Sequence, residues 1–455
     1  MSDGAFSTRY RAATTGIFAL GFLIAFEALA VTTAMPLAAR DLRGQSLYAL
    51  TFSAFAAAGV IGNVAAGAWS DRSGPRRPLV AGVALFAAGL VVSGTALTMP
   101  VLVAGRALQG LGGGTIGVAL YVLVARVYPE TLHPRIFALL AAAWVLPSLI
   151  GPFAAGAVAT FLSWHWVFLG IVPLVGAATL LLVPQLRGAP MPGTGAPLPL
   201  RRIGWSCVAA GALLAMRPLL DVPAVGPVLA LLAAVVAVLA LRPLLPPGAL
   251  AAVRGLPSVV LVRGGLSAGF AAADAYLPYS LIALRDVSPV VAGGITTVGA
   301  VSWATGSELQ SRLRRVSDRA CIAAGAASFF AGAVLVGVGT AAGLIPVVVA
   351  GWLLAGLGIG TAYPRTSTAA LSLSAPEERG RSSAALQIGD GFGNGLALTV
   401  VGIVTAFAPD AQFAGAFALA ALLGLLVLVL APRTAARPLS RGGAAGPASS
   451  PRGRG

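Results

Sequence analysis

The sequence is poor in the residues that soluble proteins place on their surfaces. It has no lysine and only two histidines, and charged residues make up 10% of its 455 residues, whereas 58% are hydrophobic. Cys207 and Cys321 have no spacing typical of a metal site or a disulfide framework. P-loop, H-E-x-x-H and C-x-x-C patterns are absent as well. We therefore expect a membrane protein that is not an enzyme and that needs no cofactor and no metal.

Fourteen apolar runs are long enough to cross a bilayer, for which a helix needs about 20 residues. They lie at 13–37, 47–69, 79–98, 100–125, 136–160, 163–184, 203–220, 223–244, 256–284, 289–309, 320–340, 343–363, 383–408 and 411–432. The first run is too long for the apolar core of a signal peptide, so we interpret it as a membrane helix. The run 203–220 is the weakest because Arg217 and Pro218 interrupt it. The predicted fold is an all-α membrane protein with fourteen transmembrane helices.

The placement of the arginines predicts the topology. All 30 basic residues are arginine; with a cytoplasmic N-terminus, 25 lie inside, Arg106 and Arg217 lie within spans, and only Arg40, Arg43 and Arg285 lie outside. This bias predicts cytoplasmic N- and C-termini in a plasma or inner membrane. Omitting one span would move later arginine clusters outside, so the two runs within 203–244 exist together or not at all. Because short arginine loops face lipid headgroups, nucleic acid is not an expected partner.

Segments of the two halves resemble each other at a nearly constant offset. AGRALQGLGGGT at 104–115 matches AGWLLAGLGIGT at 350–361 in eight of twelve positions. Nearly the same offset aligns Arg135 with Arg381 and Glu27 with Asp274. We predict two six-helix repeats, an architecture of transporters whose substrate site lies between the halves. The predicted divisions are an N-terminal bundle at 1–184, a linker with two inserted transmembrane helices at 185–250, a C-terminal bundle at 251–432 and a disordered cytoplasmic tail at 433–455.

The loop GAWSDRSGPRRPL at 67–79 follows the second span. Asp71 can pair with an arginine at a neighbouring helix end and so hold the cytoplasmic side shut. The loop closely resembles the G-x-x-x-D-R-x-G-R-R signature of the major facilitator superfamily, and an ordinary basic loop is the alternative. The gating residues that the resemblance implies are Gly67, Asp71, Arg72, Gly74, Arg76 and Arg77. The matching loop of the second half, GSELQSRLRRVSDR at 306–319, keeps only a degraded version.

Two further segments resemble signatures of the same family. LVAGRALQGLGGG at 102–114 places Arg106 within a span, and it resembles the fourth-helix R-x-x-x-G signature, whose arginine is implicated in proton coupling. A structural arginine that caps buried carbonyls is the alternative. WVLPSLIGPFAAG at 144–156 resembles the antiporter signature G-P-x-x-G-G through Gly151, Pro152 and Gly156, with Ala155 in place of one glycine.

The first span is typical of one subfamily. FEALAVTTAMPLAARDL at 26–42 is similar to the first-helix motif of the fourteen-helix drug:proton antiporters, with Glu27 and Met35 departing from the motif. SWHWVFLGIVPLVGA at 163–177 is similar to a second segment of that subfamily, with His165 and Gly170 departing. The resemblance covers about residues 20–430 and implies drug export in exchange for protons.

Three carboxylates, Glu27, Asp274 and Asp390, lie well inside spans. An ionised carboxylate in hydrocarbon is unfavourable, so each should face water, pair with a cation or carry a proton. With Arg106 they are the proton-coupling candidates, and a structural ion pair is the alternative for each. Because Glu27 and Asp274 occupy matching repeat positions, we expect them to face one cavity. The candidate pocket residues are Phe26, Gln109, Trp144, Tyr276, Tyr279, Gln387, Phe392 and Asn394.

The favoured function is secondary active, proton-coupled efflux of hydrophobic or cationic small molecules by alternating access. The expected partners are the small-molecule substrate, protons and membrane lipids, and a monomer suffices for the mechanism. A metabolite uptake symporter of the same fold and a non-transporting membrane sensor or lipid-handling protein are the alternatives. The Gly151-Pro152 pair and the fourteen predicted spans favour export.

Overall fold

The computed structural model describes residues 5–8, 10–188, 195, 197–313, 315–375, 378–408 and 411–435, and the long elements among them are all α-helices. The first half contains α1 (Arg11–Asp41), α2 (Tyr48–Ser73), α3 (Arg76–Gly94), α4 (Met99–Val127), α5 (His133–Phe161), α6 (His165–Leu169) and α7 (Ile171–Gly188). The middle contains α8 (Leu200–Leu219) and α9 (Gly226–Leu241). The second half contains α10 (Leu256–Arg285), α11 (Pro289–Arg312), α12 (Asp318–Ala342), α13 (Ile345–Ser372), α14 (Arg379–Phe407) and α15 (Gln412–Leu430). Beyond residue 435, the predicted tail lies outside the described residues.

Within the described ranges, twelve spans are long and apolar enough to cross a membrane. α6 and α7 together supply one of them, from His165 to Leu186. α8 and α11 are not among the twelve. The physical reason is that α8 contains three arginines, while α11 is rich in glycine, serine and threonine. The all-helical membrane fold is thus confirmed, and the count of fourteen spans is supported only as far as these twelve apolar helices.

Small residues allow the helices to approach closely, and the two halves use them alike. A side chain on Gly105 of α4 would collide with the backbone of α3 at Ser93. A side chain on Gly351 of α13 would collide with the backbone of α12 at Val336. These two glycines occupy the same place in the repeated segments at 104–115 and 350–361. The internal repeat of the sequence is therefore a repeat of helix-packing contacts.

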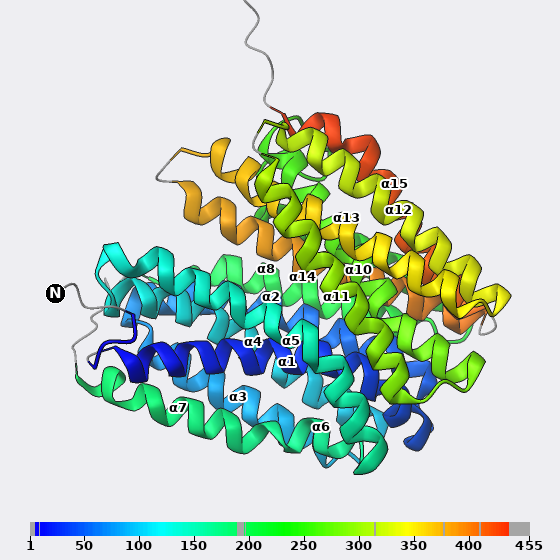
Figure 1. Cartoon of the computed structure of the whole chain (residues 1–455), viewed down its shortest axis with the longest axis horizontal. Helices are drawn as coiled ribbons and strands as arrows, with labels where there is room; N and C mark the ends of the chain where they lie inside the picture. The colour runs from blue at the N-terminus through cyan, green and yellow to red at the C-terminus, as the bar shows by residue number, and fades with distance from the viewer. Residues whose placement is uncertain are drawn as a thin grey trace, which may run out of the picture.

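The helices group into two bundles with matching internal packing. In the first half α4 packs on α2 and α3, and α1 packs on α5 and α7. In the second half α13 packs on α11 and α12, and α10 packs on α14 and α15. In Figure 1 the N-terminal bundle, blue to teal, lies below the C-terminal bundle, yellow-green to red.

Two seams join the bundles, one between α2 and α14 and the other between α5 and α11. We call the helix ends near Arg72 and Arg312 the Arg-rich face, and the ends near Asp41 and Arg285 the Arg-poor face. The ribbons of the two bundles converge toward the Arg-poor face and diverge toward the end at which the chain begins (Figure 1).

The helices α8 and α9 form a hairpin that covers one seam. α8 packs on α2 and α14 as well as on α9. Leu213 of α8 lies against Gly395 of α14, in an apolar cluster that includes Val60 and Phe392. The other side of α9 exposes large apolar side chains, among them Leu231 and Val235, as expected for a helix that faces lipid.

Candidate functional site

A carboxylate and a guanidinium meet inside the N-terminal bundle. Glu27 lies midway along α1 and Arg106 lies in the first third of α4, and the two side chains are 0% and 1% exposed. Arg106 Nη1 donates a hydrogen bond to Glu27 Oε1. Among the described residues, the second carboxylate oxygen, Oε2, is buried without a hydrogen-bond partner. The structure therefore brings together two residues that the sequence singled out, and it leaves one of their oxygen atoms unsatisfied.

Arg106 is held by three further contacts. Its Nη1 donates to Gln109 Oε1 at 2.6 Å, and its Nε donates to the carbonyl oxygen of Thr51 in α2 at 3.4 Å. The guanidinium carbon lies 4.4 Å from the centre of the Phe55 ring. Gln109 Nε2 in turn donates to Ser93 Oγ of α3 at 3.3 Å. The network links α1, α2, α3 and α4 around one guanidinium, so a change in its charge balance acts on four helices at once.

A second ion pair lies in the C-terminal bundle. Arg263 of α10 donates from Nε to Asp390 Oδ2 of α14 at 2.9 Å and from Nη1 to Ser367 Oγ of α13 at 2.6 Å. The hydroxyl of Tyr363 donates to the same carboxylate oxygen at 2.7 Å, and the guanidinium carbon lies 3.9 Å from the centre of its ring. The Arg263 and Asp390 side chains are 12% and 15% exposed. The sequence analysis counted Arg263 with the cytoplasmic arginines, although its position within the run 256–284 was a signal that it is buried.

Asp274 of α10 is the third carboxylate, and the residue is 8% exposed. Within the described part of the chain it makes no ion pair and no hydrogen bond. The structure gives no contact between Asp274 and Glu27, so their common cavity stays a prediction.

Four aromatic rings close the space between the bundles at the Arg-poor face. The ring of Tyr48, the first residue of α2, lies 5.2 Å from that of Tyr276 and 4.4 Å from that of Tyr279, both on α10. The Tyr48 hydroxyl donates to the carbonyl oxygen of Ala275 at 2.5 Å. Phe413 of α15 lies 5.1 Å from Tyr279. Tyr276 and Tyr279, predicted as pocket residues, therefore belong to a closed ring cluster in this conformation.

The other predicted pocket residues of the N-terminal bundle lie in different places. Phe26 stacks on Phe22 with ring centres 6.1 Å apart and lies against Gly151 of α5. Gln109 belongs to the Arg106 network described above. Trp144 of α5 is 54% exposed, so it faces lipid or the space between the bundles.

The three predicted pocket residues of α14 also diverge. Gln387 is exposed. Phe392 is buried in the cluster formed with α2 and α8, so it is a packing residue in this conformation. Asn394 has a buried amide oxygen without a hydrogen-bond partner among the described residues.

The loop that resembles the gating signature lies on the Arg-rich face. α2 ends at Ser73, and Gly74 follows with φ 77°, a left-handed conformation that glycine adopts without strain. The backbone nitrogen of Gly195 donates to the carbonyl oxygen of Arg72 at 3.3 Å, so Gly195 contacts this loop. The charged side chains of the loop are all exposed: Asp71, Arg72, Arg76 and Arg77.

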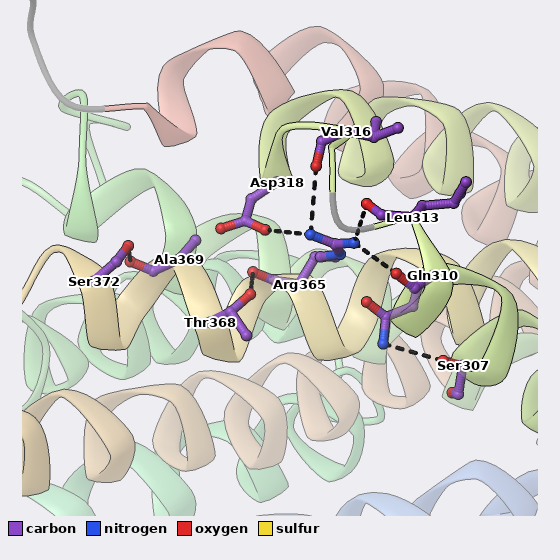
Figure 2. Close-up of polar contacts among 9 residues, drawn as sticks. All are labelled: Ser307, Gln310, Leu313, Val316, Asp318, Arg365, Thr368, Ala369 and Ser372. Carbon is purple, nitrogen blue, oxygen red and sulfur yellow. Dashed lines mark hydrogen bonds and ion pairs between the residues drawn. The ribbon is translucent and has the colours of Figure 1, made fainter.

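The matching loop of the second half is held by an arginine that the sequence analysis did not select. Arg365 of α13 donates from Nη2 to the carbonyl oxygens of Gln310 at 2.6 Å and Leu313 at 2.9 Å (Figure 2). Its Nη1 donates to Asp318 Oδ1 at 3.0 Å and to the carbonyl oxygen of Val316 at 3.4 Å. Arg365 thus adds side-chain hydrogen bonds to carbonyl groups at and just after the end of α11, and it joins α11, α12 and α13.

The segment that resembles the antiporter signature forms the α5–α11 seam. A Cβ atom on Gly156 would overlap the carbonyl oxygen of Pro289, the first residue of α11. In the reverse direction, a Cβ atom on Gly293 would overlap the carbonyl oxygen of Pro152. The two bundles therefore touch backbone to backbone near the Arg-poor face, which requires glycine at both positions.

One enzyme-like pattern is present in α10, where residues 265–269 read GLSAG. A G-x-S-x-G nucleophile depends on a sharp turn between a strand and a helix. Ser267 instead lies inside a continuous helix, so the pattern provides no such turn here.

Comparisons with known proteins agree with this arrangement. The sequence profile of the Major Facilitator Superfamily matches residues 17–319. A probable multidrug-efflux transporter of Mycobacterium tuberculosis is 30% identical over 391 residues, which cover 81% of this chain and 82% of that protein. The multidrug efflux pump SdrM of Staphylococcus aureus is 28% identical over 162 residues, which cover 36% of each chain.

Solved structures share the fold. A POT family transporter in complex with a thioalcohol-conjugated peptide has a TM-score of 0.70 at 15% identity, covering 95% of this chain and 98% of that one. A D-xylose-proton symporter has a TM-score of 0.65 at 15% identity, covering 94% and 99%. The profile spans more than half of the chain, the relative from Mycobacterium tuberculosis spans four fifths of it, and both agree with the paired bundles. The chain belongs to the Major Facilitator Superfamily.

Proposed function

We propose that the chain is a secondary transporter that exports hydrophobic or cationic small molecules in exchange for protons, by alternating access. Two relatives named for multidrug efflux support this proposal, as do the paired bundles with buried charges in each. As a member of the superfamily, the chain is a transporter and not an enzyme. One chain contains both bundles, so a monomer is sufficient.

Our proposed topology has fourteen spans and cytoplasmic termini, with the divisions at 1–184, 185–250 and 251–432. α11 packs between α5 and α13, and Thr296 and Ser302 are among its buried residues, so that side of the helix needs no apolar surface. α8 and α9 cross as a pair. After replacement of Cys207 and Cys321, cysteines introduced at Gly195 and at Gly443 should react with an impermeant maleimide from the cytoplasmic side only. Labelling from outside at either position would contradict this topology.

We assign the conformation to the state that is open toward the cytoplasm. The assignment is supported by the Tyr48 ring cluster and by the contact of Gly156 with Pro289, because both close the Arg-poor face. In a fold built from two repeats, rocking of one bundle against the other exposes the central site to each side in turn. The outward-open state therefore requires that these two contacts separate.

The proton-coupling site in this proposal is the pair formed by Glu27 and Arg106. The observation that carries it is a fully buried ion pair between α1 and α4 with one unsatisfied carboxylate oxygen. Protonation of Glu27 removes the counter-charge of Arg106. Loss of one partner of a buried ion pair costs about 3–5 kcal/mol, which is enough free energy to favour a different arrangement of the bundles. Gln109 and the carbonyl oxygen of Thr51 position the guanidinium for this response.

The test uses proteoliposomes with an imposed proton gradient. Wild-type protein should accumulate a fluorescent drug against its concentration gradient, whereas Glu27→Gln should bind the drug but fail to accumulate it. Glu308→Gln is the matched control, because the Glu308 side chain is 62% exposed and pairs with Arg312 one turn away. If Glu27→Gln transports normally and Asp390→Asn or Asp274→Asn does not, the coupling role belongs to the C-terminal bundle. Transport by all three variants would refute proton coupling.

The direction of coupling separates export from uptake. The fold alone allows both, since its structural neighbours include a D-xylose-proton symporter. An exporter accumulates drug on the side from which protons leave, whereas a symporter moves drug and protons the same way. The same proteoliposomes, loaded with the gradient reversed, give this answer.

A further inference from the structure

The first turn of α2 lies between the buried ion pair and the closed Arg-poor face. Arg106 Nε donates to the carbonyl oxygen of Thr51 at 3.4 Å, and one turn earlier the Tyr48 hydroxyl donates to the carbonyl oxygen of Ala275 at 2.5 Å. Thr51 and Tyr48 are both buried. Ala275 belongs to α10, so the second hydrogen bond joins the two bundles. One helical turn therefore contacts both the ion pair of the N-terminal bundle and the backbone of the C-terminal bundle.

A hydrogen bond within this turn connects the two contacts. Thr51 Oγ1 donates to the carbonyl oxygen of Tyr48 at 2.7 Å. The residue that accepts from Arg106 is thus hydrogen-bonded to the residue that donates to α10. Buried hydrogen bonds in such a chain polarise one another, so a change at one end alters the strength of the bond at the other.

The contacts of Arg106 with α2 depend on the charge of Glu27. Among the described residues, Arg106 is the charged group that meets Glu27, although α5, α7 and α10 also pack on α1. When Glu27 takes up a proton, the guanidinium keeps its charge but loses its counter-charge. It then depends on nearby dipoles and on the face of the Phe55 ring, whose centre lies 4.4 Å away. The Thr51 carbonyl is one of those dipoles, so the force on the first turn of α2 changes with the protonation of Glu27.

The next turn of α2 is less free to respond. A Cβ atom on Gly110 of α4 would overlap the carbonyl oxygen of Phe55, so the two helices touch backbone to backbone at this level. Their separation is therefore fixed there. The turn from Tyr48 to Thr51 precedes this contact, and it is the part of α2 that bonds to Ala275.

We propose that Tyr48 is a positioning residue that transmits the protonation state of Glu27, through Arg106 and Thr51, to the C-terminal bundle. The inference rests on the proposed proton coupling and specifies how the proton site acts on the Arg-poor face. Opening of this face separates α2 from α10, so the hydrogen bond to Ala275 is among the contacts that break. The strength of this bond then sets how readily the face opens in each protonation state of Glu27.

The test measures opening of the Arg-poor face in full-length protein in lipid nanodiscs. Spin labels replace Leu97 and Leu344, which are exposed in the loops that follow α3 and α12, one in each bundle. After replacement of the two native cysteines, the distance between the labels gives the ratio of open to closed protein. Tyr48→Phe should raise this ratio about fivefold, because it removes one hydrogen bond between the bundles and keeps the ring.

A double-mutant cycle then tests the link itself. Glu27→Gln imitates the protonated state. It should change the ratio at least about threefold in the wild-type background but less than about 1.5-fold in the Tyr48→Phe background. A second variant, Thr51→Val, interrupts the chain without removing the hydroxyl that bonds to Ala275. In that background the effect of Glu27→Gln should fall below about twofold.

Tyr128→Phe is the matched control. The Tyr128 hydroxyl shares a hydrogen bond with Thr14 at 2.9 Å, and the residue is as buried as its counterpart in α2, but both partners belong to the N-terminal bundle. In the Tyr128→Phe background, Glu27→Gln should keep its full effect on the ratio. Loss of the effect in this background as well would overturn the inference, because any lost hydroxyl would then suffice.

Independent effects of Glu27→Gln and Tyr48→Phe would also overturn the inference, as would an unchanged ratio in Glu27→Gln alone. These results leave the proposed function standing if wild-type proteoliposomes still move drug under a proton gradient. The proposed function fails separately, if the wild type moves no compound under that gradient although the cycle shows coupling between Glu27 and Tyr48.

Discussion

The two halves of this transporter hold their charges in opposite ways. In the N-terminal half the ion pair of Glu27 and Arg106 is fully buried, while the charged side chains of the loop after α2 are exposed. In the C-terminal half the ion pair of Arg263 and Asp390 is partly exposed.

The corresponding loops differ as well. Arg365, with a 12% exposed side chain, ties the loop between α11 and α12 to α13 in the C-terminal half. We infer that removing a charge from the core destabilises the N-terminal half more than the C-terminal half. We also infer that the loop after α2 can move more easily than the loop between α11 and α12. The reason is that charge burial, and not the number of charges, determines what a substitution changes.

The strongest contrast is expected when the arginine of each pair is removed. Arg106→Ala should destabilise the protein by about 3–5 kcal/mol because it leaves Glu27 buried and unpaired. Arg263→Ala should have a smaller effect, since Asp390 keeps the Tyr363 hydroxyl and some access to water. Thermal unfolding in detergent, followed by tryptophan fluorescence, measures both. The double variant Glu27→Gln/Arg106→Gln should regain most of the stability but should not transport. If Arg106→Ala and Arg263→Ala lose equal stability, the two cores do not differ in this way.

A second contrast concerns two glycines of the N-terminal half, of which only Gly156 lies in a segment that resembles a family signature. Gly156→Ala should slow transport and destabilise the α5–α11 seam by about 1–3 kcal/mol, because the new Cβ overlaps the Pro289 backbone. Gly117→Ala is the matched control, since a Cβ atom there meets no atom within 4 Å. Efflux rates and unfolding temperatures of the two variants give the comparison. Wild-type efflux by Gly156→Ala would show that the seam can separate slightly without harm.

The loops give a third contrast, in which stability and transport respond separately. Asp318→Asn should lower stability by about 1 kcal/mol, because it weakens the charge-assisted bond to Arg365 at a side chain that is 30% exposed. We propose that the N-terminal loop acts in gating, so Asp71→Asn should cripple transport while the protein stays folded and inserted. Both variants are measured by unfolding and by efflux. If Asp71→Asn transports at the wild-type rate, the N-terminal loop is only a positively charged anchor.

The smallest effect is expected at the surface of the C-terminal half. The pair of Glu308 and Arg312 has side chains that are 62% and 75% exposed. Neutralising Glu308 should change stability by no more than about 0.5 kcal/mol, because water and salt screen such pairs. A shift of several degrees in the unfolding temperature of Glu308→Gln would show that the Arg-rich face depends on this pair.

The sequence predicted those site residues whose type is unusual for their position. Arg106 and Glu27 were selected because a charge within an apolar run is rare and needs a partner. Arg263 was missed because it lies only seven residues from the start of its run, where an arginine can equally well reach the headgroups. Arg365 was missed for a similar reason, since α13 extends to Ser372 and the apolar run ends at 363. A hydropathy pattern locates the apolar part of a helix but not its full length.

The sequence by itself determined that this chain is a helical membrane protein with two related halves. Apolar runs determine which segments form membrane helices, and arginine placement determines their orientation. Both features depend on nearby sequence, so they can be interpreted without knowing which helices are neighbours. Only the tertiary structure decided which charges meet. Arg263 and Asp390 are 127 positions apart, and their contact depends on the rotation and crossing of α10, α13 and α14. The same packing leaves Asp274 without an ion pair in the described part of the chain. Neither helix orientation nor seam geometry can be deduced from spacing alone.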